Sequence, residues 1–395
     1  MRELRAAHSG RVVLALVLLL QTGAALRPPA ARFDAPTFDP LVMDGIRAGA
    51  FPGAALVVGR RDTVLFAKGY GHLTWSASSP VVDAESTLYD LASLTKVIAT
   101  TTAVMLLVDR GKVRLDAPVA AYVPEFRGAG TAGVTVWHLL THTSGLRPTL
   151  PLYRDAVDGA AALGLVHAAI PEVPPGTRVV YSDLNAILLG EVVQRAAGEA
   201  LDAFTEREVF APLALRQTTF RPAARLRARI APTGLWRGHP VAGVVNDQNA
   251  VRLGGVAGHA GLFAGARDVA RFAQFMLRDG ALLDGRHLVR AETVRAFTTR
   301  ATPRGRGTRV EARALGWQAL PTGESVSSAG TLFGPRSFGH TGWTGTSLWI
   351  DPDRDVFVVL LTNRAFAPRA RRPFTVLKEV RGRVADAAAR ASDAH

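Results

Sequence analysis

The chain has 395 residues, 48% of them hydrophobic and 20% charged, which is the composition of a folded globular protein. It contains no cysteine, and this excludes disulfides, a thiol nucleophile, cysteine-bound zinc and a lipidated N-terminal cysteine. The net charge of +14 comes mainly from arginine, since only four of the 47 basic residues are lysines. No nucleic-acid motif accompanies these arginines, so we expect no nucleic-acid partner and only a weak attraction to anionic polymers of a cell envelope.

The N-terminal segment has the features of a secretory signal. Three arginines accompany a short apolar core at residues 12–20, and small residues follow it. This apolar segment is shorter than a membrane-spanning helix requires. Residues 1–26 therefore predict cleavage, export to the periplasm or the cell exterior, and no membrane span afterwards, with an uncleaved anchor as the alternative. Residues 27–37 are expected to form a flexible lead-in.

Strands are predicted near both ends of the chain, and helices are predicted between them. The predicted strands are 54–58 and 64–67 in one hairpin, 347–350 and 356–361 in another, and a third late strand at 337–340. The predicted helices are 98–109, 136–140, 156–168, 184–197, 267–278 and 374–389. Residues 300–335 are rich in Gly, Ser, Thr and Arg, which is typical of an inserted or mobile loop.

This order predicts an α/β fold of the α+β sandwich type. The N- and C-terminal segments form an antiparallel sheet flanked by helices, and a mostly helical lobe is inserted between them. We expect the sheet lobe at about 38–97 and 265–390 and the helical lobe at about 98–264, within one domain over 38–390. The cleft between the two lobes is the expected place for a functional site.

Ser93-Leu94-Thr95-Lys96 is the strongest chemical signal in the chain. Positions i and i+3 share a helix face, so the Ser93 hydroxyl and the Lys96 amine can meet over one turn. An amine can take the serine proton if burial keeps the amine uncharged. Taken alone, the pattern is better explained by a serine that caps a helix.

Two later segments can supply partners for this pair. Tyr181 precedes Ser182 and Asp183, and its hydroxyl can move a proton to or from Ser93; the alternative is a buried tyrosine beside a helix capped by Ser182 or Asp183. At the end of a late strand, His340 and its neighbours Thr341 and Gly342 can bind a substrate, while the backbone N–H of Trp343 can pair with that of Ser93 as an oxyanion hole. The alternative is an ordinary strand end.

Together, these three segments resemble the serine β-lactamase and penicillin-binding-protein superfamily. The similarity is greatest to the branch that holds class C β-lactamases, D-alanyl-D-alanine carboxypeptidases and related esterases. It covers roughly residues 38–385 and includes weaker features at 67–71, 139–146 and 361–364. Residues 246–263 resemble a subgroup of periplasmic esterases or penicillin-binding-like proteins.

The resemblance implies a role for each of these residues. Ser93 is the acylated nucleophile, Lys96 the amine that activates it, and Tyr181 the second acid/base group; no cofactor is implied. The residues expected on the substrate-binding side are Asp183, His340, Thr341 and Gly342.

Two departures from the class C pattern weaken the expectation of β-lactam hydrolysis. Asp183 stands where that pattern has asparagine, and its charge would repel or reorganise around such a substrate. His340 stands where it has lysine, and a histidine is only partly charged at neutral pH. Recognition of a β-lactam carboxylate should therefore be weaker.

Other histidines receive less specific interpretations. His138 and His142 have the i, i+4 spacing of a zinc site but lack the glutamate of H-E-x-x-H, so we predict no metal and a role in bracing the following loop. His259 lies in a glycine-flanked turn and either lines the cleft or makes a structural hydrogen bond.

The sequence therefore predicts a hydrolase that cleaves an ester or amide carbonyl through a Ser93 acyl-enzyme, of the esterase or penicillin-binding type. The alternatives are a class C-type β-lactamase, a D-Ala-D-Ala carboxypeptidase or muropeptide hydrolase, and a non-catalytic envelope-binding protein. The expected partners are a small ester, a β-lactam or a peptide derived from peptidoglycan.

Overall fold

The structure is a computed structural model that describes residues 32–302, 312–320, 327–366 and 374–394. The expected signal segment 1–26 lies outside these residues. So do the start of the expected lead-in and parts of the expected 300–335 loop.

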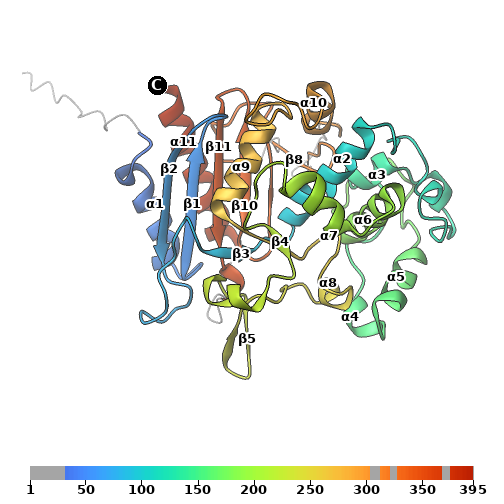
Figure 1. Ribbon diagram of the computed structural model, residues 1–395, viewed down its shortest axis with the longest axis horizontal. Coiled ribbons are helices and arrows are strands. Elements are labelled where there is room, and N and C mark those ends of the chain that lie inside the picture. Colours follow the sequence, from blue (N-terminus) through green and yellow to red (C-terminus); the bar gives the residue numbers. More distant parts are fainter. Residues whose placement is uncertain (1–31, 303–311, 321–326, 367–373, 395) are drawn as a thin grey trace, which may run out of the picture. The chain divides into compact units, whose positions relative to one another are not determined.

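A six-stranded antiparallel sheet joins the early and late parts of the described chain (Figure 1). Its order is β2 (Val64–Gly71), β1 (Gly53–Gly59), β11 (Val356–Thr362), β10 (Ser347–Asp351), β9 (Phe338–Thr341) and β8 (Gln318–Ala319). Both predicted hairpins and the third late strand are confirmed. The first and last of the long strands pair directly, with Leu56 opposite Leu360, so the predicted closure of the sheet by the two ends is also confirmed.

Helices cover both faces of this sheet. Successive residues of a strand point to opposite faces, so one strand contributes to the cores on both sides. Ala55 and Val57 of β1 face the core that includes α9 (Ala266–Leu277). Leu56 and Val58 face a second core, built with α1 (Ala35–Arg47) and α11 (Phe374–Asp393). Each of these strands is therefore buried on both faces, which explains its nearly continuous apolar sequence.

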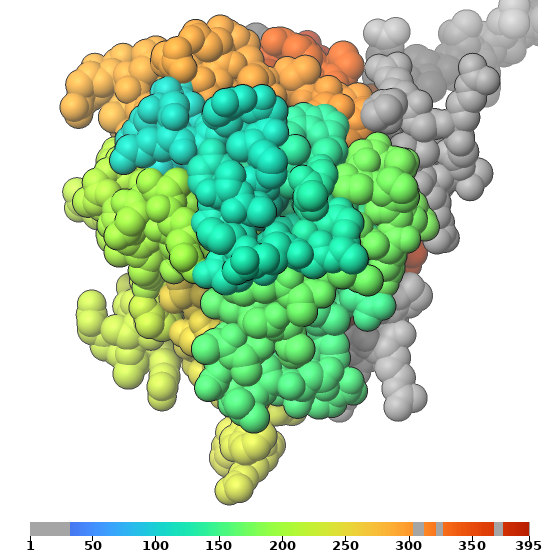
Figure 2. Space-filling model, turned by 90° about the vertical axis from the view of Figure 1, so that its right-hand side faces the viewer, coloured from blue at the N-terminus to red at the C-terminus, as the bar shows by residue number. Residues whose placement is uncertain are grey.

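The middle of the chain forms the mostly helical region, whose cyan to green segments make up the face seen in Figure 2. Its α-helices are α2 (Thr102–Asp109), α3 (Val136–Leu140), α4 (Leu152–Asp155), α5 (Gly159–His167), α6 (Asp183–Ala197), α7 (Leu201–Thr205) and α8 (Gln248–Arg252). Another helix, α10 (Ala291–Thr298), follows α9. Shorter helical turns are η1 (Lys96–Thr101), η2 (Val119–Ala121), η3 (Thr131–Gly133), η4 (Glu206–Phe210), η5 (Ala224–Arg229) and η6 (Arg364–Phe366).

Two smaller sheets were not predicted. The first has the order β3 (Leu88–Asp90), β7 (Leu262–Gly265) and β4 (Thr219–Phe220). The second is the hairpin of β5 (Gly234–Trp236) and β6 (His239–Val241). The first matters for function, because the Leu91 N–H donates to the Leu262 carbonyl. This bond sets the chain that leads into Ser93 beside the chain that follows His259.

Helix boundaries differ from the predictions in several places, and α11 for example ends at Asp393 rather than at residue 389. Helix α1 begins at Ala35 with its N-cap at Asp34, so the end of the expected flexible lead-in is helical. The predicted helix 156–168 begins only at Gly159, because the Asp158 side chain caps it there. The predicted helix 98–109 begins earlier, with the π-helical turn η1, and Gly111, just after its end, has a positive φ of 68°.

The expected 300–335 loop is partly ordered core. β8 joins the edge of the large sheet, and Trp317 is 1% exposed. Arg313, in the same segment, is also 1% exposed. A polar, glycine-rich composition was therefore a poor guide here.

Of the helices in the described residues, none has both the length and the apolar character that a membrane crossing needs.

Close packing between Gly258 and helix α6 generates a stability prediction. A Cβ atom at Gly258 would lie 1.9 Å from the Ala186 carbonyl oxygen. We expect Gly258→Ala to lower the free energy of unfolding by about 1–3 kcal/mol, because the helix must move away. Gly164→Ala is the control: it lies inside α5 with nothing within 4 Å of its added Cβ, and should raise stability by about 0.5–1 kcal/mol. Chemical denaturation of both variants checks this, and equal effects would contradict it.

Candidate active site

Ser93 lies at the entrance to η1, directly after a residue in an unusual conformation. Ala92 has φ +46°, in the left-handed region that residues with a Cβ rarely adopt. The Asp90 side chain stabilises this conformation by accepting the Ala92 N–H at 2.8 Å. Burial raises the pKa of the Asp90 carboxyl to about 6. A buried acid therefore shapes the turn that presents Ser93.

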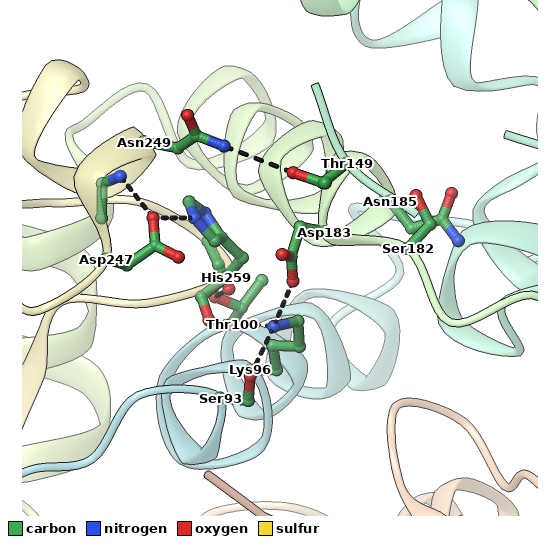
Figure 3. A network of polar contacts seen from close by, with 12 residues as sticks. Ser93, Lys96, Thr100, Thr149, Ser182, Asp183, Asn185, Asp247, Asn249 and His259 are labelled. Carbon is green, nitrogen blue, oxygen red and sulfur yellow. Dashed lines mark hydrogen bonds and ion pairs between the residues drawn. The ribbon is translucent and has the colours of Figure 1, made fainter. Parts of the chain in front are cut away.

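Lys96 lies one turn further on and is 4% exposed at its side chain. Its Nζ donates to Ser93 Oγ at 3.0 Å and to the His259 carbonyl oxygen at 3.0 Å. It also forms an ion pair with Asp183 Oδ1 at 2.8 Å (Figure 3). These three contacts match the three donors of an ammonium group. The sequence prediction that Ser93 and Lys96 meet is thus supported by the geometry.

The charge of Lys96 differs from the sequence expectation. Burial lowers the pKa of Lys96, but the negative charge of Asp183 and the contact with Tyr181 outweigh burial and raise it above its ordinary value. Lys96 is therefore a buried ammonium rather than an amine kept neutral by burial. An ammonium cannot take the proton of Ser93 unless it gives one of its own protons away.

Asp183 lines the cavity beside Ser93, where a substrate-binding residue is expected, but its carboxylate is already paired. It occupies the first turn of α6, where the positive end of the helix dipole favours a carboxylate, and its direct partner is Lys96. Ser182 is the N-cap residue of α6, but its side chain makes no capping bond. The Ser182 hydroxyl instead donates to the Arg147 carbonyl at 2.6 Å, so Ser182 takes the predicted N-cap position without the capping bond.

Tyr181 lies between two cations. Lys96 Nζ is 5.0 Å from the centre of its ring, and the Arg313 guanidinium carbon is also 5.0 Å away. The rings of His142 and His340 lie 4.8 Å and 5.8 Å from it. Its hydroxyl is buried and makes no hydrogen bond with any described residue.

Arg313 was missed by the sequence analysis. Nothing marked it, because it is one of many arginines in a segment expected to be a loop. Its charge reaches the site: together with burial it holds the pKa of both His142 and His340 well below the ordinary value.

His340 is a neutral, buried residue of β9. Its Nδ1–H donates to the Thr341 carbonyl at 2.9 Å, and the residue is 2% exposed. Since burial, Arg313 and Lys96 lower its pKa, His340 offers no positive charge to a substrate carboxylate. His340 is therefore uncharged, and not partly charged as the sequence analysis expected.

Gly342 is required by the packing of the protein itself. A Cβ atom there would lie 2.6 Å from the Leu91 carbonyl oxygen and 2.2 Å from Thr346 Oγ1. Two hydroxyls tie the turn to the chain before Ser93: Thr344 Oγ1 donates to the Asp90 carbonyl, and Thr346 Oγ1 to that of Leu91. The glycine thus lets the β9–β10 turn approach the Ser93 turn closely.

Trp343 lies in that turn, is 62% exposed, and lines one cavity with Ser93. Within the described ranges, the backbone N–H groups of Ser93 and Trp343 donate to no carbonyl or side chain. Both are therefore available to a ligand, as an oxyanion hole requires. Thr341, by contrast, lines a separate cavity with Lys378 and Arg381.

His259 is buried, at 1% exposure, and lines the same cavity as Ser93. Its backbone carbonyl accepts from Lys96, and its Nε2–H donates to Asp247 Oδ1 at 3.0 Å. Both alternatives considered for His259 are therefore correct. Asp247 was not singled out from the sequence, although it belongs to the segment that resembles the esterase subgroup.

The histidines with zinc spacing do not share a site. His138 Nδ1 accepts from the Thr135 N–H, whereas His142 Nδ1 accepts from Ser182 N–H and from the Asn185 amide. His142 braces its loop against the start of α6, as predicted, whereas the His138 side chain bonds Thr135 and caps the start of α3. Among the described residues, the cluster able to hold a metal ion is instead Asp183, Asp247 and His259.

A nucleophile, a buried lysine and a tyrosine between a sheet and a helical region define a serine hydrolase of the β-lactamase and penicillin-binding type. Comparison with known proteins agrees, since the sequence matches the family description Beta-lactamase over residues 38–381. The chain belongs to this β-lactamase family.

The relatives and structural neighbours cover most of the chain. An Escherichia coli K12 protein named "Putative D-alanyl-D-alanine carboxypeptidase" is 33% identical over 81% of this chain and 80% of its own length. EstCE1, described as a hydrolase with promiscuous acyltransferase activity, superimposes with a TM-score of 0.72 at 22% identity, covering 90% of this chain and 98% of its own. A class C β-lactamase gives 0.69 at 23% identity, with 88% and 95% coverage. The predicted fold class, family and serine-hydrolase activity are thereby confirmed.

Proposed function

We propose that this protein is an exported esterase-type hydrolase that forms an acyl-enzyme at Ser93. The observation that carries this proposal is the chain of contacts from Ser93 Oγ to Lys96 Nζ at 3.0 Å and on to Asp183 at 2.8 Å. This chain gives the serine proton a route to a carboxylate. Export rests on the signal-like features of residues 1–26.

Lys96 acts as a proton relay in this proposal. As Ser93 attacks the substrate carbonyl, Lys96 passes one proton to Asp183 and takes the proton of Ser93, so that it is an ammonium before and after the step. The developing oxyanion accepts the N–H groups of Ser93 and Trp343. Tyr181 gives its proton to the leaving group and regains one from Lys96, and Asp183 then returns its proton to Lys96. The departing alcohol or amine has therefore gained the proton that Ser93 lost, and Tyr181, Lys96 and Asp183 are back in their starting states. Water then attacks the acyl-enzyme, one of its protons returns to Ser93 Oγ, and the acid is released.

A D-Ala-D-Ala carboxypeptidase is the second candidate, and the name of the 33% identical Escherichia coli relative favours it. Efficient β-lactam hydrolysis is less well supported, because His340 is neutral and buried where the class C pattern has a lysine. A non-catalytic envelope-binding role is opposed by the arrangement of Ser93, Lys96 and Tyr181, which a retired site has no reason to keep.

The nucleophile is tested by acylation. Purified protein is incubated with a short-chain activated ester, a D-Ala-D-Ala peptide or a penicillin, and its intact mass and product release are followed. We expect fast ester turnover and a longer-lived penicillin adduct on Ser93. Ser93→Ala should lose both, with ester hydrolysis falling by about a thousandfold or more. The control is Ser86→Ala, a half-buried serine whose hydroxyl, within the described part of the chain, bonds Asp83 alone. Hydrolysis retained in Ser93→Ala would refute the mechanism, and faster release of D-alanine than of the ester acid would favour the carboxypeptidase.

The relay is tested by the pH dependence of Asp183→Asn. Removing the carboxylate removes the leading cause that raises the pKa of Lys96, so burial then lowers it. At neutral pH we expect kcat/KM for an ester to fall by about a hundredfold, because the proton acceptor is gone. As pH rises through the lowered pKa, Lys96 loses its proton, can take the serine proton directly, and activity recovers.

The control for this profile is Asp202→Asn, which also changes an acid in the first turn of a helix but one that pairs with Arg221 instead. It should keep the wild-type profile. An Asp183→Asn profile that is merely lowered in parallel with the wild type, with no alkaline recovery, would contradict the relay.

A further inference from the structure

The cavity beside Ser93 carries an unusual balance of charge. It has a volume of about 380 Å³, and its lining includes Ser93, Tyr181, Asp183, Asp247, His259 and Trp343. Two of these residues are carboxylates, although many substrates of this superfamily are themselves anionic. The question is which ligand such a cavity favours.

Asp247 remains ionised in this cavity. Burial opposes its ionisation, but the hydrogen bond from His259 outweighs burial and lowers the pKa of the carboxyl to about 2. His259 Nε2 is the donor to Asp247 at 3.0 Å, and His259 Nδ1 is buried and has no partner within the described ranges. Two cations, Lys96 and Arg313, lie 5.0 Å from the centre of the Tyr181 ring, but the residues that line the cavity include both carboxylates and neither of these cations.

Asp247 also has an oxygen to spare. Its two hydrogen bonds, from His259 Nε2 and from the Ala250 N–H, both end on Oδ1, and its side chain is 35% exposed. One oxygen each of Asp183 and Asp247 and one ring nitrogen of His259 lie within 4.8 Å of one another. A single cationic group placed there can reach an oxygen of each carboxylate at hydrogen-bonding distance.

Two exposed aromatic rings complete this environment. Tyr153 is 44% exposed and Trp343 is 62% exposed, and both line the cavity. The faces of such rings attract cations. An organic ammonium fits this site better than a metal ion does, because Lys96 already occupies Asp183 at 2.8 Å and would repel a divalent ion.

We infer that this hydrolase selects substrates that carry a cationic group, such as a primary ammonium, close to the scissile carbonyl, and that Asp247 binds this group. The inference rests on the proposed function, since it takes Ser93 as the nucleophile that the cavity serves. It narrows the substrate class to esters or amides of amino-bearing acids, in preference to acids with a second carboxylate.

The test compares three S-benzyl thioesters whose acyl chains differ only in their terminal group. These are 3-aminopropanoyl (cationic), butanoyl (neutral) and succinyl (anionic). A primary alkylammonium stays charged at about pH 7. Released thiol is measured with a thiol reagent, which the cysteine-free chain does not consume, and EDTA is present throughout. We expect kcat/KM for 3-aminopropanoyl to exceed that for butanoyl by about tenfold or more, with succinyl slowest.

Asp247→Asn keeps an oxygen for the cap of α8 but removes the charge, and should bring the ratio of 3-aminopropanoyl to butanoyl close to one. The matched control is Asp158→Asn, which changes an aspartate that caps α5 in the same way, and should keep the wild-type ratio.

Each outcome decides the inference. Equal rates for the cationic and neutral thioesters, or a cationic preference that appears only when metal replaces EDTA, would overturn it while Ser93 catalysis stands. An unchanged ratio in Asp247→Asn would overturn the assignment to Asp247. If none of the three thioesters is hydrolysed or acylates Ser93, the proposed function fails and this inference falls with it.

Discussion

The arrangement of the site depends on one buried ion pair, between Lys96 and Asp183 at 2.8 Å. Burying a lone ammonium is costly, and a nearby carboxylate that also accepts a hydrogen bond offsets that cost. The pair joins the turn that bears Ser93 to the first turn of α6, and the third donor of Lys96 adds the His259 carbonyl. Three segments far apart in sequence therefore meet at one nitrogen atom, within hydrogen-bonding distance of the nucleophile.

The same charges determine what surrounds the pair. The positive charges of Lys96 and Arg313, added to burial, keep His142 and His340 neutral. Neither histidine therefore offers a positive charge to a ligand, while the cavity lining holds the ionised Asp247. This polarity is the reverse of what recognition of an anionic substrate requires, and it connects the proton relay with the proposed choice of a cationic substrate.

Much of the fold and part of the site could be predicted from the sequence, and the reason differs from element to element. Strands such as β1 and β11 are buried on both faces, so their apolar runs were unambiguous, and the spacing of Ser93 and Lys96 was enough to bring them together. The partners of Lys96 were harder to predict, because a salt bridge between residues 96 and 183 produces no local pattern in the sequence. Arg313 and Asp247 were missed for the same reason: their importance comes from burial and from neighbours distant in sequence.

The protonation state of Lys96 tests this account most directly. The chain has four lysines, so Nζ signals in lysine labelled with nitrogen-15 can be assigned by substituting them one at a time and followed by NMR across pH. The account predicts that the Lys96 signal keeps the chemical shift of an ammonium up to about pH 10, since Asp183 raises its pKa. A Lys96 signal that titrates to the neutral amine below about pH 8 would contradict it, and would restore a lysine held uncharged by burial as the base.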